Sequence, residues 1–390
     1  MARFGILFVL MGLSAGCDSG GPASVAPPSS RAEPLPIRVA ADRAGLRWGA
    51  AISAGPLAAD TAYRQLAGGA FNIVTAENAL KFSELQPQPG VFTFEDADRI
   101  AEFARANGQK LRGHVLVWHV QLPAWVEEGT FTRDELIAVM RTHIHTVLGH
   151  YRTRYADVVA EWDVVNEAIE ADGSRRQSIW QRVIGDDYIA LAFRFAAEAW
   201  PGLPLYYNDF YENNFVLLAS QLGPDGSLQP GRPLGPGASP LLSNCALIPK
   251  CAATRALAEH LLAQGVAIAG IGFQAHIASV APPDYAQLTA WIAPLGLRWA
   301  LTELDAPCPT GALDNALCYA AQAQTYRSAA QACLDSPACD TVVQWGVNDR
   351  YTWWPGLSFG LFGEALAFDD AYQPKPAADA LLTLFQDYAQ

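Results

Sequence analysis

The 390-residue sequence lacks a basic patch. Its formal net charge is −13, and the acidic residues are scattered rather than gathered in blocks. This charge argues against nucleic-acid binding and against a polyanionic substrate, and it fits a neutral polymer. The sequence also has no GxSxG nucleophile elbow and no phosphate-binding P-loop. Half of the residues are apolar and 17% are charged, which is the composition of a globular protein with one sizeable core.

The N-terminus has the features of a targeting segment. The apolar run Phe4–Leu13 follows Arg3 and is too short to span a bilayer, for which about 20 residues are needed. Small residues then precede Cys17, a pattern that resembles a bacterial lipoprotein cleavage site; ordinary signal-peptide cleavage nearby is the alternative. We expect a secreted or cell-envelope protein, anchored to the membrane by a lipid on Cys17. The expected organisation is a signal segment over 1–17, a flexible linker rich in Gly, Pro and Ser over 18–40, and one folded domain over 41–390.

The remaining cysteines fit an oxidising compartment. Apart from Cys17 there are six, and they form three pairs that are close in sequence. Three small disulfide loops are the simplest arrangement, although six cysteines allow many other connectivities. A metal site is less favoured, because no pair has the CxxC spacing and no histidine lies beside one. The candidate pairs are Cys245 with Cys251, Cys308 with Cys318, and Cys333 with Cys339.

Strand-like and helical patterns alternate from about residue 45 onward. The predicted strands are 47–52, 71–75, 110–118, 158–165, 204–208, 266–274, 298–302 and 341–346, and the predicted helices are 97–106, 133–152, 188–199, 254–264 and 319–333. Alternation of this kind predicts βαβ units and a parallel sheet. Eight units indicate a closed (β/α)8 TIM barrel in a single catalytic domain, with an open doubly wound sheet as the alternative.

Polar residues fall at the ends of the predicted strands, where the chemistry of a barrel is found. They include His114 on the third strand, Glu167 on the fourth and Glu303 on the seventh. A long segment rich in Gly and Pro, from 213 to about 252, interrupts the pattern after the fifth strand. We expect it to be a loop on the catalytic face.

Glu167 and Glu303 are the candidate catalytic pair, because glycoside cleavage needs two carboxyl groups that flank the bond. The segment 162–167 (WDVVNE) resembles the acid/base motif of glycoside hydrolase family 10, the endo-β-1,4-xylanases, and 302–305 (TELD) resembles its nucleophile motif. The resemblance extends over residues 45 to 385. It implies a retaining double-displacement hydrolysis of xylan or xylo-oligosaccharides, with Glu303 as nucleophile and Glu167 as acid/base.

The resemblance also implies roles for other residues. Asn166 would bind the sugar 2-hydroxyl, while His276 and Asp305 would keep Glu303 ionised. Trp118, Trp345 and Trp353 would form walls around the sugar at the cleavage point. The remaining substrate-binding candidates are Glu77, Asn78, Lys81, His114, Gln121, Asn208 and Gln274. The chain departs from the family pattern at Phe210 (usually Tyr), Ala275 (usually Gly) and Ala269 (usually Asp), none of which supplies a catalytic atom.

Two further patterns carry little weight. Residues 270–275 match the loose GxGxxA fingerprint, but no helix opens there and no acidic residue follows at the required distance. His143, His145 and His150 lack the spacing and the acidic neighbour of a metal site. We therefore expect no cofactor, no metal and no nucleic-acid partner, and a monomer. Two alternatives stay open: a retaining β-glucanase or cellulase on the same barrel, and a non-catalytic surface lipoprotein that binds glycans.

Overall fold

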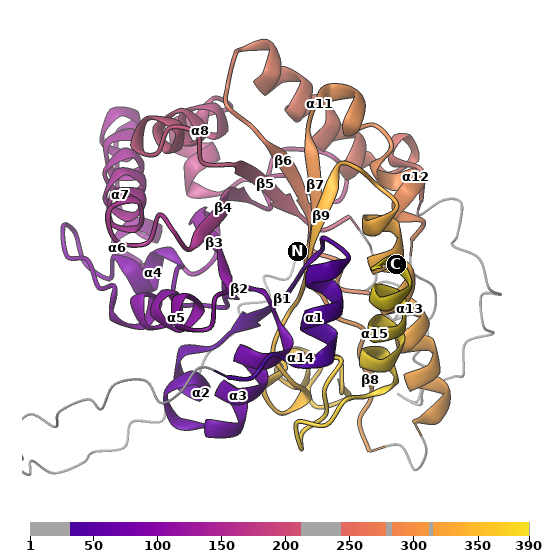
Figure 1. The fold of residues 1–390 in the computed structure, drawn as a ribbon. Helices are drawn as coiled ribbons and strands as arrows, with labels where there is room; N and C mark the ends of the chain where they lie inside the picture. Colours follow the sequence, from indigo (N-terminus) through magenta and orange to yellow (C-terminus); the bar gives the residue numbers. More distant parts are fainter. Residues whose placement is uncertain (1–31, 212–242, 278–282, 312–314, 390) are drawn as a thin grey trace, which may run out of the picture. The chain divides into compact units, whose positions relative to one another are not determined.

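A computed structural model describes residues 32–211, 243–277, 283–311 and 315–389. Eight parallel strands form a closed barrel in the order β1-β2-β3-β4-β5-β6-β7-β9 (Figure 1). β1 pairs with β9, with Arg47 opposite Thr341, and this pairing closes the sheet. The predicted (β/α)8 barrel is confirmed, and the open sheet was wrong. The strands are β1 Arg47–Ile52, β2 Ile73–Ala76, β3 Lys110–Val117, β4 Val159–Asn166, β5 Leu205–Asp209, β6 Gly270–Phe273, β7 Arg298–Leu304 and β9 Cys339–Gln344.

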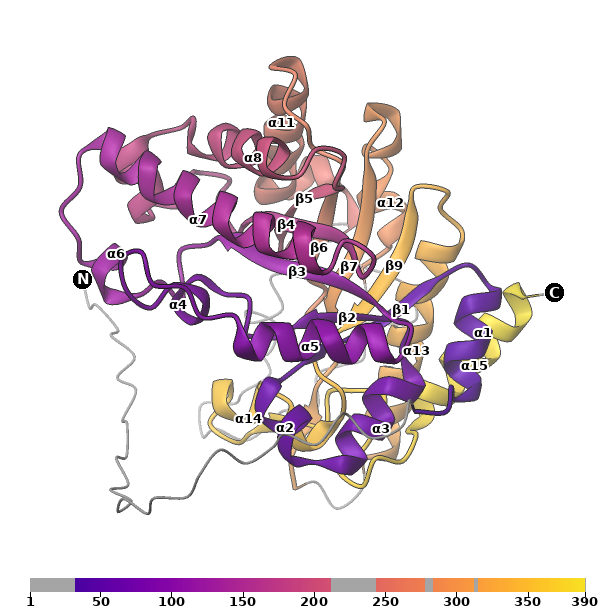
Figure 2. The same ribbon diagram turned by 60° about the vertical axis from the view of Figure 1, so that its left-hand side comes forward.

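Helices surround the barrel (Figures 1 and 2). All five predicted helices are confirmed: α5 Glu95–Ala106, α7 Arg133–Arg154, α8 Tyr188–Ala199, α11 Pro249–Ala263 and α13 Ala316–Leu334. The structure adds the longer helices α1 Pro36–Arg43, α3 Thr61–Ala70 and α15 Pro376–Tyr388, which the sequence did not predict. The short helices are α2 Ala54–Ala59, α4 Phe82–Leu85, α6 Ala124–Glu127, α12 Tyr285–Thr289 and α14 Trp354–Leu357. Single turns of 3-10 helix cover Cys245–Leu247, Ala293–Leu295 and Asp349–Tyr351, and a π-helix covers Trp180–Ile184.

The expected boundary of the linker at residue 40 was wrong. α1 begins at Pro36, because a proline fits the first turn of a helix, where its missing N–H leaves no bond unmade. Ile37, Ala40 and Ala41 are buried on one face of α1. α1 lies beside α15 in both views (Figures 1 and 2). The linker therefore ends before Pro36, and most of it lies outside the described residues.

The barrel strands are buried on both faces. On the face toward the helices, the Trp162 ring lies beside that of Tyr151 on α7, with centroids 5.3 Å apart. Trp162 on β4 is fully buried against Gly113 on β3, where an added Cβ would lie 2.0 Å from the Trp162 ring. Only glycine fits at this position. A fully buried cation, Arg112, forms ion pairs with Glu161 at 2.5 Å and with Asp163. These two carboxylates compensate the charge that burial would otherwise make costly.

The three expected disulfides are confirmed. Cys245 bonds to Cys251, Cys308 to Cys318 and Cys333 to Cys339. β8 (Cys308–Pro309) pairs antiparallel with β10 (Phe362–Gly363) outside the barrel. Most of the expected 213–252 loop lies outside the described residues, and its end is already part of α11. No helix in the described part of the chain is long and apolar enough to cross a membrane.

Candidate active site

The predicted site residues gather at the carboxyl ends of the barrel strands. Asn166 is the last residue of β4, and Glu167 follows it. Glu303 lies near the end of β7, and His276 pairs with Asp305 in a parallel bridge just beyond β6 and β7. The other predicted residues belong to the ends of β2, β3, β5, β6 and β9 or to the segments that follow them: Glu77, Asn78, Lys81, His114, Trp118, Gln121, Asn208, Gln274, Trp345 and Trp353.

Glu303 is 5% exposed and is held by two side chains, one from β5 and one from the segment after β6. The Asn208 amide nitrogen donates to Glu303 Oε1 at 2.8 Å, and His276 Nε2 lies 3.2 Å from Oε2. Thr302 Oγ1 donates to the Asn208 oxygen at 2.7 Å and fixes that amide in its orientation. Both carboxylate oxygens therefore have a partner.

His276 lies between two carboxylates. Its Nδ1 is 2.9 Å from Asp305 Oδ2, and the indole Nε1 of Trp353 donates to the same oxygen at 2.8 Å. Burial disfavours the imidazolium, but Asp305 and then Glu303 outweigh this and raise the pKa of His276 to about 10. Burial also opposes ionisation of Glu303, but the hydrogen bond from His276 and nearby positive charge lower its pKa overall. Glu303 is therefore an ionised carboxylate beside a fixed cation.

Glu167 has a backbone φ of 54°, in the left-handed region that residues other than glycine rarely adopt. Gln274 Nε2 donates to Glu167 Oε1 at 2.8 Å, and the Asn166 amide lies 3.3 Å from the same oxygen. With the Asn166 amide turned over, its oxygen would accept from the Trp118 indole N–H at 3.1 Å. The contact between Gln274 and Glu167 links the end of β6 to the candidate acid/base.

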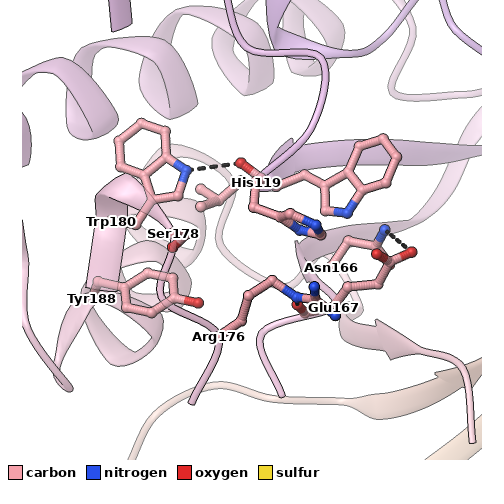
Figure 3. A pocket seen from close by; sticks show the side chains of 9 residues that line it. His119, Asn166, Glu167, Arg176, Ser178, Trp180 and Tyr188 are labelled. Atoms are coloured by element: carbon pink, nitrogen blue, oxygen red, sulfur yellow. Dashed lines mark hydrogen bonds between the residues drawn. The ribbon is translucent and has the colours of Figure 1, made fainter. Parts of the chain in front are cut away.

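A small pocket adjoins Glu167 (Figure 3). The figure shows Arg176 and His119 beside Glu167, with Trp180, Ser178 and Tyr188 lining the other side. Arg176 Nε donates to the main-chain oxygen of Glu167 at 2.8 Å. Burial lowers the pKa of His119 to about 4, with Glu167 opposing and Arg176 adding to the shift, so this imidazole is neutral at ordinary pH.

A second polar group follows β2. Lys81 Nζ lies 4.8 Å above the centroid of the Trp118 ring and 5.8 Å from that of Trp345. The same ammonium lies 3.3 Å from the oxygen of Asn78, which also accepts from Gln121 at 3.1 Å. Burial raises the pKa of Glu77, with a hydrogen bond from Ser53 opposing the rise. Forked polar groups beside indole faces suit a ligand with many hydroxyl groups and apolar ring faces.

His114 links the site to the charged interior of the barrel. Its Nδ1 lies 3.0 Å from Asp163 Oδ2, and Asp163 is itself paired with Arg112. Burial tends to raise the pKa of Asp163, but Arg112 and His114 lower it overall, which keeps the carboxylate ionised. The His114 ring meets the Trp345 ring edge to face, with centroids 5.4 Å apart. His114 therefore has a fixed orientation.

A family comparison gives the class of this site. The model of glycosyl hydrolase family 10 matches residues 37–217 and 244–384, which include both glutamates. The chain belongs to this family. In the described part of this family 10 chain, no group of three or more His, Cys, Asp or Glu side chains could hold a metal ion.

Relatives and solved structures agree with this membership. Endo-1,4-beta-xylanase 2 of Aureobasidium pullulans is 36% identical over 330 residues, which is 82% of this chain and 81% of the relative. Endo-1,4-beta-xylanase B of Thermotoga neapolitana is 33% identical over 90% of this chain and 92% of the relative. The crystal structure of xylanase 10B from Thermotoga petrophila RKU-1 in complex with xylobiose superposes with a TM-score of 0.78 at 30% identity, covering 93% of this chain and all (100%) of that one.

Several residues of this family 10 site were not found from the sequence. Ser53 donates to Glu77, Arg176 contacts the main chain of Glu167, and Lys250 pairs with Asp209 behind β5. Asn208-Asp209 at the strand end was the one available signal for this last pair. The histidines of α7 have packing or surface roles: His143 stacks on Phe82 with ring centroids 3.6 Å apart, His150 stacks on Phe94 at 3.8 Å, and the partly exposed His145 lies 3.5 Å from Glu198.

Proposed function

We propose that this chain is a retaining endo-1,4-β-xylanase in which Glu303 is the nucleophile and Glu167 the general acid/base. The observation that carries the proposal is the different setting of the two carboxylates. Glu303 is held ionised by His276 and Asn208, whereas Glu167 accepts from a neutral amide, that of Gln274. Two carboxyl groups in unlike environments are the arrangement that glycoside hydrolysis requires.

In the first step Glu303 attacks the anomeric carbon, and the bond to the leaving oxygen breaks as Glu167 transfers its proton to that oxygen. The product is a covalent xylosyl ester of Glu303. In the second step Glu167 removes a proton from water, and the water oxygen attacks the anomeric carbon and releases Glu303. Two inversions give net retention. Asn166 donates to the sugar 2-hydroxyl, a contact that strengthens in the transition state.

The preference for xylose follows from the indole walls. Trp353 is fixed by its hydrogen bond to Asp305, and its ring centroid lies 4.9 Å from that of His276. Trp345 contacts the rings of both His114 and His276. Such fixed rings accept a pyranose without a hydroxymethyl group and crowd one that carries it. Glu77, Asn78 and Lys81 bind the hydroxyl groups of the next sugar on the glycone side.

The experiment is hydrolysis of xylan and of carboxymethylcellulose, with the anomeric configuration followed by proton NMR. We expect xylo-oligosaccharides whose first-formed reducing end is β, and little release from carboxymethylcellulose. Glu303→Ala should abolish turnover, and azide should then yield the inverted α-glycosyl azide from an activated xyloside. Release of the α-anomer by the wild type would refute the retaining mechanism.

A matched substitution separates loss of chemistry from loss of charge. Glu95→Gln removes one exposed carboxylate in the first turn of α5. It should retain wild-type turnover of xylan. Wild-type turnover by Glu303→Ala under the same conditions would remove Glu303 from the mechanism.

We also propose that the enzyme is exported and anchored through a lipid on Cys17. Three disulfides in the folded domain support export, because such bonds persist in oxidising compartments. The full-length protein should partition into the detergent phase of Triton X-114 when it is expressed in a bacterium. Cys17→Ala should move it to the aqueous phase, and detergent partitioning of that variant would rule out the anchor.

A further inference from the structure

The main chain at Glu167 is held by its surroundings. A φ of 54° is disfavoured for glutamate, so the surrounding contacts have to stabilise it. The Glu167 N–H donates to the Asn208 carbonyl at 3.0 Å, and the Glu167 carbonyl accepts from Arg176. The next N–H, that of Ala168, is buried and donates to the hydroxyl oxygen of Tyr207 at 3.0 Å. This last contact is the start of a chain of side chains.

Tyr207 connects Ala168 to a buried ion pair. Its hydroxyl donates to Asp209 Oδ2 at 2.5 Å. The other oxygen of Asp209 lies 2.7 Å from Lys250 Nζ and accepts from the Phe210 N–H at 2.9 Å. Asp209 and Lys250 are 0% and 3% exposed. Burial raises the pKa of Asp209 to about 7, and Lys250 opposes the rise. The lysine therefore favours the ionised carboxylate that the Tyr207 hydroxyl contacts.

Lys250 is itself fixed on three sides. Its ammonium lies 3.2 Å from the centroid of the Phe210 ring. Its position in the first turn of α11 is set by Pro249 and by the neighbouring Cys251, which is bonded to Cys245. The Lys250 carbonyl accepts from Thr254 Oγ1 at 2.9 Å. The cation is therefore part of a rigid helix start.

The same helix start supports the segment that follows Glu167. Residues 168–176 fold back on themselves, since Ile169 pairs with Arg175 and the Arg176 N–H donates to the Ala168 carbonyl at 2.9 Å. At the tip, Gly173 has a φ of 86°, and a Cβ there would lie 2.9 Å from the Pro249 carbonyl. The acid/base segment is thus supported at its base through Tyr207 and at its tip by Pro249.

We propose that Lys250, acting through Asp209 and Tyr207, is a positioning residue that sets the placement of the general acid Glu167. This inference rests on the proposed function, because it assigns a means of positioning to the acid of that reaction. Among the contacts of the described residues, none joins Lys250 to the other carboxylate, Glu303. Its loss should therefore impair proton donation and spare nucleophilic attack.

Aryl xylobiosides separate these two steps. A 2,4-dinitrophenolate leaves without protonation, whereas a phenolate leaves slowly unless an acid donates a proton to it. For Lys250→Met we expect kcat/KM on phenyl β-xylobioside to fall at least about tenfold more than on 2,4-dinitrophenyl β-xylobioside, because general acid catalysis contributes about 100-fold or more. Lys250→Arg keeps the charge and should recover most of the loss.

The chain offers a matched control. Lys375 forms a second buried ion pair, with Asp349 at 2.8 Å, and contacts the Glu364 carbonyl rather than the Glu167 segment. Lys375→Met should change kcat/KM on both substrates by the same factor. Tyr207→Phe removes a single hydroxyl and repeats the test if Lys250→Met does not fold, as judged by near-UV circular dichroism; it should show the same selective loss.

The inference would be overturned if Lys250→Met lowered kcat/KM equally on the two substrates, or left both rates unchanged. The same criterion applies to Tyr207→Phe if that variant is used in its place. A wild-type enzyme that cleaves neither xyloside nor xylan would instead refute the proposed function, and the inference with it. These outcomes are distinct, because the first two need an active wild type.

Discussion

Replacing His276 tests whether this residue is a cation between Glu303 and Asp305. Its pKa in the folded protein is about 10, against about 6.5 in an unfolded chain. A rise of about 3.5 in pKa corresponds to about 5 kcal/mol, at about 1.4 kcal/mol per unit. Because the folded-state pKa is the higher one, this stabilisation is fully present below pH 6.5 and is lost as the pH rises towards 10.

Urea unfolding of the wild type and of His276→Gln at several pH values from 6.5 to 10 measures this contribution. The difference in unfolding free energy between the two proteins should shrink by several kcal/mol, at most about 5, across that range. The raised pKa values of Asp209 and Asp349, about 7 and about 6, are common to both proteins and cancel. A difference that does not change with pH would refute the assignment of a cation.

The control is His260→Gln, which removes an exposed histidine on α11 whose ring lies 2.7 Å from Gln264. This variant should not reproduce the pH-dependent difference. Activity gives an independent check, since loss of the His276 hydrogen bond makes Glu303 easier to protonate. The acid limb of kcat/KM should therefore move to higher pH in His276→Gln.

Three further substitutions follow from individual contacts. Gly272→Ala places a Cβ 2.1 Å from the Asn208 oxygen. It should lower kcat on xylan by at least about tenfold and the free energy of unfolding by about 1–3 kcal/mol. An unchanged kcat would contradict the support of Glu303 by Asn208. Trp353→Phe removes the hydrogen bond to buried Asp305 and should lower kcat/KM by about tenfold or more, measured on xylohexaose against wild type. Arg112→Met leaves Glu161 and Asp163 buried without their main cation, and thermal unfolding should show a loss of about 3–5 kcal/mol; a melting temperature equal to that of the wild type would contradict it.

The parts of the fold that could be predicted have strong local patterns. The strands that end in Glu167 and Glu303 are short apolar runs followed by polar residues, and α5, α7, α8, α11 and α13 have long apolar repeats. α3 was missed because Gly68 and Gly69 oppose helix formation, yet their lack of side chains is needed for packing: a Cβ on Gly68 would lie 2.7 Å from the Asn107 side chain. Tertiary packing outweighs local preference there.

The site could be predicted only where a residue lies in a recognisable motif. Glu303, His276 and Asn166 have such motifs, whereas Lys250 lies in a stretch without one and meets Asp209 only when α11 packs behind β5. Ser53 and Arg176 are similar, because each reaches the site through a contact with a residue from another segment or turn. For such pairings, the sequence can indicate one partner, as the strand end does for Asp209, but the second partner depends on how separate segments pack.

The pairing of β1 with β9 has a consequence for how the enzyme comes into being. Arg47 meets Thr341, so the ring of strands joins the two ends of the folded domain. Contacts between such distant parts of a chain form late, because a very long loop has to close first. Trp345 and Trp353 come after this last strand, so a nascent chain released before β9 would lack both the closed ring and two of the three sugar walls. Hydrolytic activity should therefore appear only when synthesis is nearly complete.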